Sequence, residues 1–145
     1  MENQTDQYRF SALLHETARF WRQRLDRRLK HLGLSQSQWL VLLKLPEDGL
    51  TQKLLAEAVG VEGPTLVRLL DRLERNGWIE RRPCPDDRRA KRVRLTPKAR
   101  DTQAAAQQIA TSLRRDILAG IDEARVDQCA AVLAEIKQQI ETIDD

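Results

Sequence analysis

The hydrophobic and polar positions between residues 51 and 96 predict two short helices followed by a β-hairpin. In the second helix, leucines recur at i, i+3, i+4 and i+7, the spacing of one buried stripe, at Leu66, Leu69, Leu70 and Leu73. Ala56 and Gly60 precede this stripe, and their small size allows two helices to approach and the chain to turn. Pro64 lies near the start of the second helix, where its missing N–H is tolerated. This pattern is typical of a helix-turn-helix.

A second face of the same helix is polar and cationic. Its members follow at i, i+3, i+7 and i+10, and they are Thr65, Arg68, Arg72 and Arg75. Short polar and guanidinium side chains on one face suit a helix that lies in the major groove of duplex DNA. A charged face that simply contacts solvent is the alternative interpretation.

A polar hairpin is predicted directly after this helix. Gly77 ends the helix, and residues 78–82 and 92–95 have the composition of two short strands. The loop between them is rich in proline, aspartate and arginine. A helix-turn-helix followed by such a hairpin is a winged helix, whose wing tip places an arginine in the minor groove. The expected fold is therefore mainly α with a small β-wing (α+β).

Helix signals also flank this central lobe on its N-terminal side. Residues 8–31 are expected to form a long helix with an apolar stripe at Leu14, Ala18, Trp21, Leu25 and Leu29. Gly33 ends this helix, and Ser35 is a candidate N-cap for an apolar, buried helix over residues 36–45. Thr51 is the corresponding N-cap for the first helix of the helix-turn-helix.

Two more helices are expected after the wing. Thr96 and Pro97 open a helix that ends near residue 119, and a last helix covers residues 122–143. The apolar positions of the last helix alternate in steps of 3 and 4, at Val126, Cys129, Leu133, Ile136, Ile140 and Ile143. This rhythm is that of a coiled-coil seam. We define these six residues as the C-terminal seam.

The C-terminal seam and the long first helix predict a homodimer. The expected division is an N-terminal dimerisation helix (1–33), a winged helix-turn-helix lobe (34–96) and C-terminal dimerisation helices (97–145). Intramolecular packing of three helices in a monomer is the alternative. Two winged helices on a two-fold axis imply a pseudo-palindromic duplex site with half-sites about one helical turn apart.

The charge distribution supports double-stranded DNA as the partner. The net charge of the 145-residue chain is only +3, but residues 68–100 hold 12 Lys or Arg against 5 Asp or Glu. The rest of the chain is therefore acidic, and the basic centre points to a polyanion. No signal peptide or long apolar run occurs, so we expect a soluble, cytoplasmic protein without a membrane partner.

The sequence contains no pattern typical of an enzyme. There is no nucleophile–base arrangement or phosphate-binding glycine loop, and His15 and His31 resemble no catalytic pair. Cys84 and Cys129 have neither metal-ligand spacing nor a disulfide framework. We therefore expect no catalytic residues, no metal and no cofactor.

Four segments of the chain carry a family resemblance, and they are residues 18–22 (ARFWR), 34–39 (LSQSQW), 66–74 (LVRLLDRLE) and 87–96 (DRRAKRVRLT). They resemble the MarR family of bacterial transcription regulators, and most closely its SlyA-like branch. The segment 87–96 is the most specific, because the wing of this family reads Asp-x-Arg and then Leu-Thr. The likeness extends from about residue 8 to the C-terminus. It implies a triangular homodimer with one winged helix-turn-helix lobe on each arm.

The resemblance also assigns roles to individual residues. Arg68 matches an arginine that reaches base edges, Arg89 matches the minor-groove arginine, and Asp87 matches the acid that orients its guanidinium. Plain phosphate neutralisation is the preferred interpretation for other wing cations. The candidate DNA-contacting residues are Thr65, Arg68, Arg72, Arg75, Asp87, Arg88, Arg89, Lys91 and Arg92. Arg81 and Arg82 are interpreted as solvated strand residues, and Glu74 and Glu80 as local salt-bridge partners.

The resemblance further implies an effector, since members of this family often respond to small phenolic or aromatic carboxylates. The candidate pocket residues are His15, Trp21, Arg22 and Trp39, because arginine pairs with a carboxylate and tryptophan stacks on a ring. Aromatic residues at helical spacing are more often part of the core, and that is the alternative.

The sequence is also compatible with two other functions. Cys84, between two prolines near the base of the wing, is a candidate redox switch, whereas Cys129 is expected to be a small hydrophobe in a core seam. An architectural protein that binds duplex DNA with low sequence preference would use the same basic face. The sequence does not decide between repressor and activator.

Overall fold

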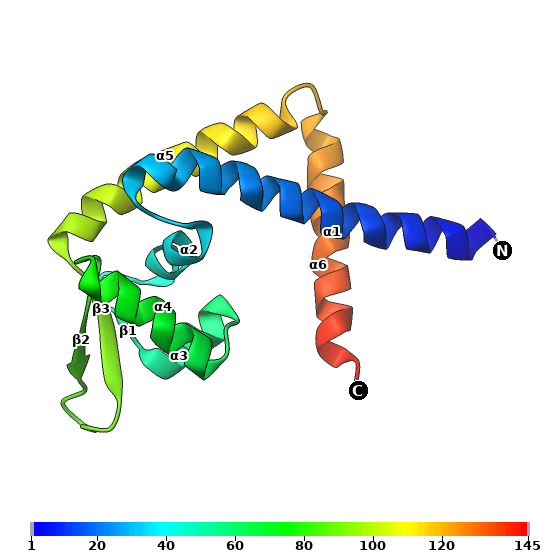
Figure 1. The fold of residues 1–145 in the computed structure, drawn as a ribbon. Helices are drawn as coiled ribbons and strands as arrows, with labels where there is room; N and C mark the ends of the chain where they lie inside the picture. The colour runs from blue at the N-terminus through cyan, green and yellow to red at the C-terminus, as the bar shows by residue number, and fades with distance from the viewer. Residues whose placement is uncertain (1, 145) are drawn as a thin grey trace. The chain divides into compact units, whose positions relative to one another are not determined.

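The computed structural model describes residues 2–144, with side chains from residue 4 onward. Figure 1 shows a mainly helical chain with one small sheet. The elements are α1 (Glu2–Leu29), a 3-10 turn (Lys30–Leu32), α2 (Gln36–Lys44), β1 (Leu50–Thr51), α3 (Gln52–Val59), α4 (Gly63–Arg75), β2 (Ile79–Pro83), β3 (Lys91–Leu95), α5 (Pro97–Leu118) and α6 (Glu123–Thr142). This order confirms the expected winged-helix fold.

The chain forms two compact units, with the boundary inside α5, between Ala110 and Thr111. The first unit contains α1 to β3 and most of α5, and the second contains the end of α5 and α6. Among the described residues, no helix is long and apolar enough to cross a membrane.

The helix starts in the first unit use the side-chain caps that the sequence predicts. Ser35 and Gln38 form a reciprocal capping box at α2, in which each side chain accepts a hydrogen bond from the other residue's main-chain N–H. The hydroxyl of Thr51 accepts from the main-chain N–H of Leu54 at 3.3 Å, and Thr96 caps α5 in the same way. These caps fix where α2, α3 and α5 begin.

The wing is part of a three-stranded antiparallel sheet with strand order β1-β3-β2. Strands β2 and β3 pair from Ile79 opposite Leu95 to Pro83 opposite Lys91. The third strand, β1, was not expected, because two residues are too short to show an alternating pattern. It pairs with β3 because Gly49, with a φ of 79°, precedes it, and a Cβ at this position would overlap the carbonyl oxygen of Val93.

The core of the first unit confirms most of the predicted apolar positions. Leu66, Leu70 and Leu73 of α4 are at most 1% exposed, although Leu69 is only half-buried. Helix α4 contacts α2, α3 and β2. The predicted burial of α2 is confirmed at its centre, where the core residues are Trp39, Val41 and Leu42. This packing holds the opposite face of α4 toward solvent.

Helix α1 begins at Glu2, six residues before the predicted start. Its predicted stripe is buried only toward the C-terminal end, at Leu25 and Leu29, and half-buried at Leu14, Ala18 and Trp21. Other large apolar side chains of this helix are exposed, namely Tyr8, Phe10, Leu13 and Phe20.

The C-terminal seam of α6 is largely uncovered in the single chain. Val126 and Ile136 are half-buried, whereas the other four members are exposed. Ile140 and Ile143 are 63% and 68% exposed. The expected core position of Cys129 is therefore not found within one chain, where this side chain is exposed.

Candidate nucleic-acid interface

The cationic face of α4 lies opposite its buried leucines. Thr65, Arg68, Arg72 and Arg75 are all exposed, as the helical spacing predicts. Among the described residues, none of these three arginines takes part in an ion pair within the chain. Their positive charges are therefore not neutralised by the protein, and an anionic partner is free to contact them.

Two tight turns determine how α4 is presented. At its start, Gly60 adopts a φ of 73° and ends α3, and Pro64 occupies the first turn of α4. At its end, Gly77 donates its N–H to the carbonyl of Glu74, and Trp78 donates to the carbonyl of Leu73. The chain thereby reverses directly into β2, so the helix and the wing are joined by only three residues, Asn76, Gly77 and Trp78, which belong to neither element.

The loop of the wing, residues 84–90, has an ordered hydrogen-bond pattern. The N–H of Cys84 donates to the carbonyl of Ala90 at 2.9 Å and extends the β2–β3 ladder by one step. The Asp87 carboxylate accepts a hydrogen bond from the main-chain N–H of Arg89 at 3.0 Å. The expected contact of Asp87 with the Arg89 guanidinium is not present among the described interactions. Asp87 thus shapes the backbone of the loop and leaves the guanidinium free.

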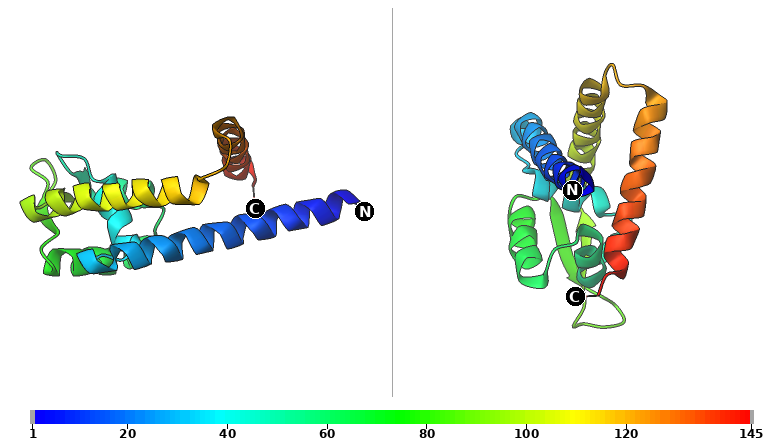
Figure 2. Two further views of the ribbon diagram at one scale, coloured as in Figure 1. Left: turned by 90° about the horizontal axis from the view of Figure 1, so that it is seen from above. Right: turned by 90° about the vertical axis from the view of Figure 1, so that its right-hand side faces the viewer.

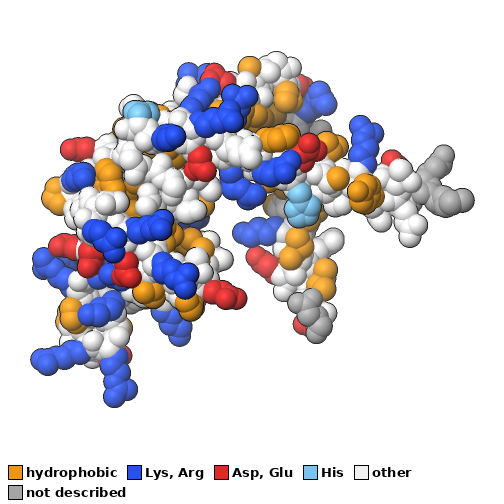
Figure 3. Space-filling view, in the orientation of Figure 1, with side chains coloured by type: hydrophobic (Ala, Val, Ile, Leu, Met, Phe, Trp, Pro, Cys, Tyr) orange, Lys and Arg blue, Asp and Glu red, His pale blue; other side chains and the backbone are white. Residues whose placement is uncertain are grey.

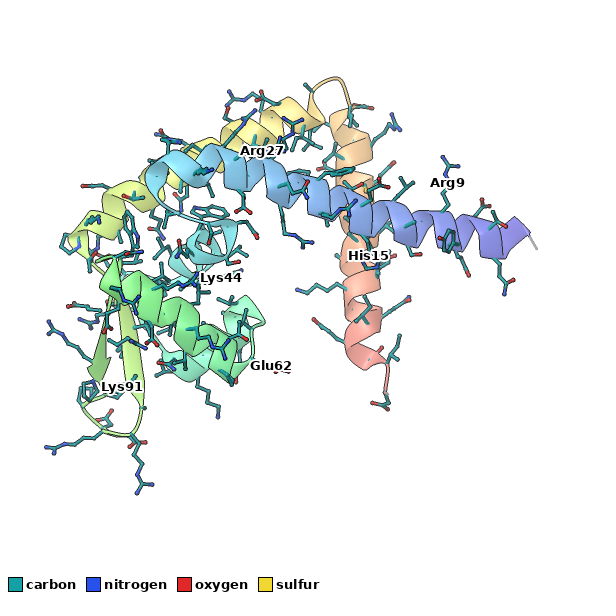
Figure 4. The ribbon with its side chains drawn as sticks, viewed as in Figure 1. Arg9, His15, Arg27, Lys44, Glu62 and Lys91 are labelled. Atoms are coloured by element: carbon teal, nitrogen blue, oxygen red, sulfur yellow. The ribbon has the colours of Figure 1, made fainter. Side chains whose placement is uncertain are left out.

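The cations of the wing tip point away from the protein. Arg88, Arg89 and Lys91 are exposed, and Figure 2 shows the wing loop extending past α3 and α4. In the space-filling view of Figure 3, blue Lys and Arg side chains project from this part of the first unit. Figure 4 places Lys91 on the same strand pair. The tip is therefore a second cationic surface beside α4.

A cleft of about 630 Å³ joins the wing tip to the helix-turn-helix. Arg89 and Lys91 line it from the wing, Gly63 lines it from the start of α4, and Gln52 and Lys53 line it from α3. Gln52 and Lys53 were not among the residues predicted from the sequence. The signal that identifies them is their place at the first two positions of the helix that Thr51 caps. The structure thus gathers parts of α3, α4 and the wing around one hollow.

Arg92 has a role inside the protein that the sequence analysis did not predict. Its guanidinium donates to the carbonyls of Asp48 and Gly49 at 3.0 and 3.3 Å, and Arg94 donates to the same Asp48 carbonyl. These bonds connect β3 to the turn before β1. Arg92 is half-buried and two of its guanidinium nitrogens donate to main-chain carbonyls, so it differs from the free arginines of α4.

Arg81 is also engaged, and the expectation that it is a solvated strand residue is wrong. Its side chain is 20% exposed and forms ion pairs with Asp71 at 2.6 Å and Glu74 at 2.9 Å. The hydrogen bond that Arg81 donates to Glu74 is the largest cause of a raised pKa for Arg81, ahead of the opposing effect of burial and of the hydrogen bond that Arg81 donates to Asp71. A raised arginine pKa favours the charged form. The group therefore stays charged at any pH at which a protein is handled.

Arg82 behaves as predicted. Its side chain is 74% exposed and, within the described part of the chain, its ion pair is with Glu80 at 3.2 Å. The predicted salt-bridge roles of Glu74 and Glu80 are both confirmed, although Glu74 pairs across two elements rather than locally.

The four candidate effector residues are not brought together in a described cleft. His15, labelled in Figure 4, and Arg22 are exposed on α1, and Trp21 is half-buried. Trp39 is 7% exposed and belongs to the core, and its indole N–H has no hydrogen-bond partner in the described part of the chain. The clefts near Leu34 and near Leu95, like the one beside the wing, are lined by none of the four.

The cysteines and acidic residues form no recognisable cofactor site. Cys84 is half-buried at the start of the wing loop, and Cys129 is exposed. Over residues 2–144, no group of three or more His, Cys, Asp or Glu side chains is placed to hold a metal ion.

Comparison with known proteins gives a consistent result. The family model described as MarR family matches residues 34–91, which include α2 to the start of β3. The crystal structure of the transcriptional regulator PA3341 is 52% identical in sequence, with a TM-score of 0.82, and the match covers 92% of this chain and 99% of that one.

Two solved relatives contain DNA. The MepR–DNA complex of S. aureus is 26% identical, with a TM-score of 0.83 and coverage of 90% of this chain and 97% of that one. A mutant MarR from E. coli with operator DNA is 25% identical, with a TM-score of 0.82 and coverage of 87% and 91%. The sequence and the winged-helix fold thus agree that this chain belongs to the MarR family of transcriptional regulators.

Proposed function

We propose that this protein regulates transcription by binding duplex DNA with α4 in the major groove and the wing tip in the minor groove. One observation carries the proposal: the arginines on α4 and the cations at the wing tip are exposed and form no ion pair within the described chain, and residues of α4 and of the wing line one cleft. Cations without protein partners are what phosphate and base contacts require. Relatives solved with DNA, MepR and a mutant MarR, support DNA as the partner.

Within this function we assign different roles to the two surfaces. Arg68 reads base edges, because it lies in the N-terminal half of α4, and Arg89 enters the minor groove. Arg72, Arg75, Arg88 and Lys91 contact phosphates and set the register. The wing sequence of residues 87–96 is the basis for placing the protein near the SlyA-like branch.

We further propose that the protein binds as a homodimer to a pseudo-palindromic site. The exposed C-terminal seam of α6 and the exposed aromatic residues of α1 are apolar surfaces of the kind that a subunit interface buries. Light scattering at micromolar concentration tests this proposal, and a monomer mass would contradict it.

The sequence preference is tested by selecting bound sequences from a random duplex pool at near-physiological salt. An enriched inverted repeat with half-site centres about 10 base pairs apart is the expected result. An architectural protein would instead give no enrichment, and its binding would weaken steeply as salt rises.

Arg68→Ala is the sharpest single test of base reading. It should reduce discrimination between the selected site and a mismatched one by about 1–3 kcal/mol, because a bidentate base contact is lost. Titrations of both duplexes by fluorescence anisotropy measure this difference. An equal loss on every duplex would show that Arg68 contacts only phosphate.

A small aromatic carboxylate remains our proposal for the effector. The half-buried Trp21 offers an indole on which a ring can stack, and the exposed Arg22 of the same helix offers a cation for a carboxylate. Titration of salicylate-like acids against tryptophan emission tests the proposal. Unchanged emission and unchanged DNA affinity up to millimolar acid would argue against it.

A further inference from the structure

Arg81 occupies a strand position that would ordinarily be apolar. Side chains two residues apart on a strand share a face, so Arg81 lies on the same face of β2 as Ile79, which is 2% exposed. Helix α4 contacts β2, and both acidic partners of Arg81 belong to α4. A guanidinium thus stands where the recognition helix meets the wing.

The bridge made by Arg81 constrains orientation as well as distance. Its Nη2 contacts Asp71 Oδ1 at 2.6 Å, and its Nε contacts Glu74 Oε2 at 2.9 Å. These are two nitrogens of one rigid plane, and the two carboxylates are three residues apart on one helix. Rotation of α4 about its axis, or a tilt of β2, would break at least one of the two bonds. A lysine ammonium imposes no such plane.

The wing transmits this constraint to its tip. The β2–β3 ladder is regular from Ile79 opposite Leu95 to Pro83 opposite Lys91, and the Cys84–Ala90 hydrogen bond continues it into the loop. A displacement of β2 relative to α4 would therefore displace the loop that carries Arg89.

We propose that Arg81 is a positioning residue for DNA recognition, which bridges Asp71 and Glu74 so that α4 and the wing tip engage one duplex at a fixed spacing. The inference rests on the proposed function, because it assigns the distance between the Arg68 and Arg89 contacts to a third arginine. Arg81 itself need not touch DNA, since its side chain is held between the helix and the sheet.

The bridge is tested first in the free protein, without DNA. Arg81→Lys retains the positive charge but loses the planar fork, and Arg82→Lys is the matched control on the opposite face of the same strand. Amide hydrogen exchange over residues 79–95 should become at least about threefold faster in Arg81→Lys and stay unchanged in Arg82→Lys, because local opening of the wing becomes easier. Unchanged exchange in Arg81→Lys would overturn the proposal.

The second test measures the spacing between the two DNA contacts. One base pair is inserted between the recognition half-site and the flanking A-tract of the selected operator. The wild-type protein should lose about tenfold in affinity on the shifted duplex, a penalty in the range of one lost base contact. Arg81→Lys should bind the original duplex more weakly than the wild-type protein does. Its affinity should fall by less than about threefold from the original to the shifted duplex.

The outcomes separate positioning from charge. If Arg81→Lys loses affinity by the same factor on both duplexes, the residue contributes only electrostatic potential and the proposal is wrong. If the wild-type protein selects no duplex sequence at all, the proposed function fails, while the exchange experiment still decides whether the bridge restrains the wing.

A second variant distinguishes loss of the bridge from misfolding of the protein. Asp71→Asn removes one carboxylate charge from a residue whose side chain is 47% exposed, and leaves Arg81 and Glu74 in place. In Asp71→Asn, the affinity lost on the shifted duplex should be smaller than in the wild-type protein, but the change should be less pronounced than in Arg81→Lys. Its thermal unfolding should stay close to that of the wild type. A wild-type spacing dependence in Asp71→Asn would contradict the two-carboxylate bridge.

Discussion

The arginines at the base of the wing differ from the cations at its tip in what they contact. Arg81, Arg92 and Arg94 at the base donate to carboxylates and main-chain carbonyls of the protein. Arg88, Arg89 and Lys91 near the tip are exposed, and no ion pair within the described chain involves them. One strand pair thus holds two classes of cation, one that builds the wing and one that is left for a partner. Local composition alone does not separate them.

Basic surfaces act through net charge and through directed hydrogen bonds, and the two depend on different properties of an arginine. A net charge attracts a polyanion whichever arginine supplies it, but only a side chain with free donors can make a directed bond to phosphate or base. We therefore expect substitutions at the base to change stability, and substitutions at the tip to change DNA affinity.

The largest effect is expected on the stability of the base, when Gly49 is replaced. Gly49→Ala places a methyl group against the Val93 carbonyl at a φ of 79°, so β1 cannot pair with β3 without a shift. We expect a loss of about 3 kcal/mol in the free energy of unfolding, from overpacking and backbone strain together. Urea denaturation followed by circular dichroism measures it. Gly33→Ala, where no neighbour would be contacted, is the matched control for the positive φ alone.

A smaller effect, on DNA affinity, is expected when Arg89 at the tip is replaced. Arg89→Ala should weaken binding by about 1–2 kcal/mol on operators with a narrow flanking minor groove, where the negative potential is strongest, and leave unfolding unchanged. Anisotropy titrations on A-tract and G·C-rich flanks give the comparison. Indifference to the flank would mean that Arg89 contacts phosphates only.

A change of about 1 kcal/mol is expected when Arg92 is removed from the base. Arg92→Ala deletes two hydrogen bonds to the Asp48 and Gly49 carbonyls, and their net contribution to stability is modest because the site is partly open to water. Urea denaturation should detect the loss. If unfolding is unchanged while DNA affinity falls as far as in Arg89→Ala, Arg92 belongs with the tip instead.

The smallest effect is expected for Cys84, which lies between base and tip. The DNA affinity of Cys84→Ser should equal that of the wild-type protein within experimental error, with or without peroxide. The reason is that only the main chain of this residue takes part in the wing ladder. A peroxide-dependent loss of affinity in the wild type that disappears in Cys84→Ser would instead establish the redox alternative.

Patterns that depend on neighbours in sequence were predicted well. The leucine stripe and the cationic face of α4 follow from a period of 3.6 residues, and the caps at Ser35, Thr51 and Thr96 act over three residues. The predicted effector residues did not come together in a described cleft. The sequence could not show this, since an aromatic residue at helical spacing has the same pattern whether it lines a pocket or fills a core. Trp39 is in the core.

The sequence by itself determined the order of the α-helices and of the two hairpin strands, the winged-helix fold and which face of α4 is free. Tertiary structure decided the roles of the wing arginines, because those roles depend on partners that are distant in sequence. Arg92 bonds to carbonyls 43 and 44 residues away, and Arg81 meets carboxylates that lie on another element. A guanidinium carries the same charge in every case, so only the position of the acceptors shows whether it holds the protein together or remains free to bind DNA.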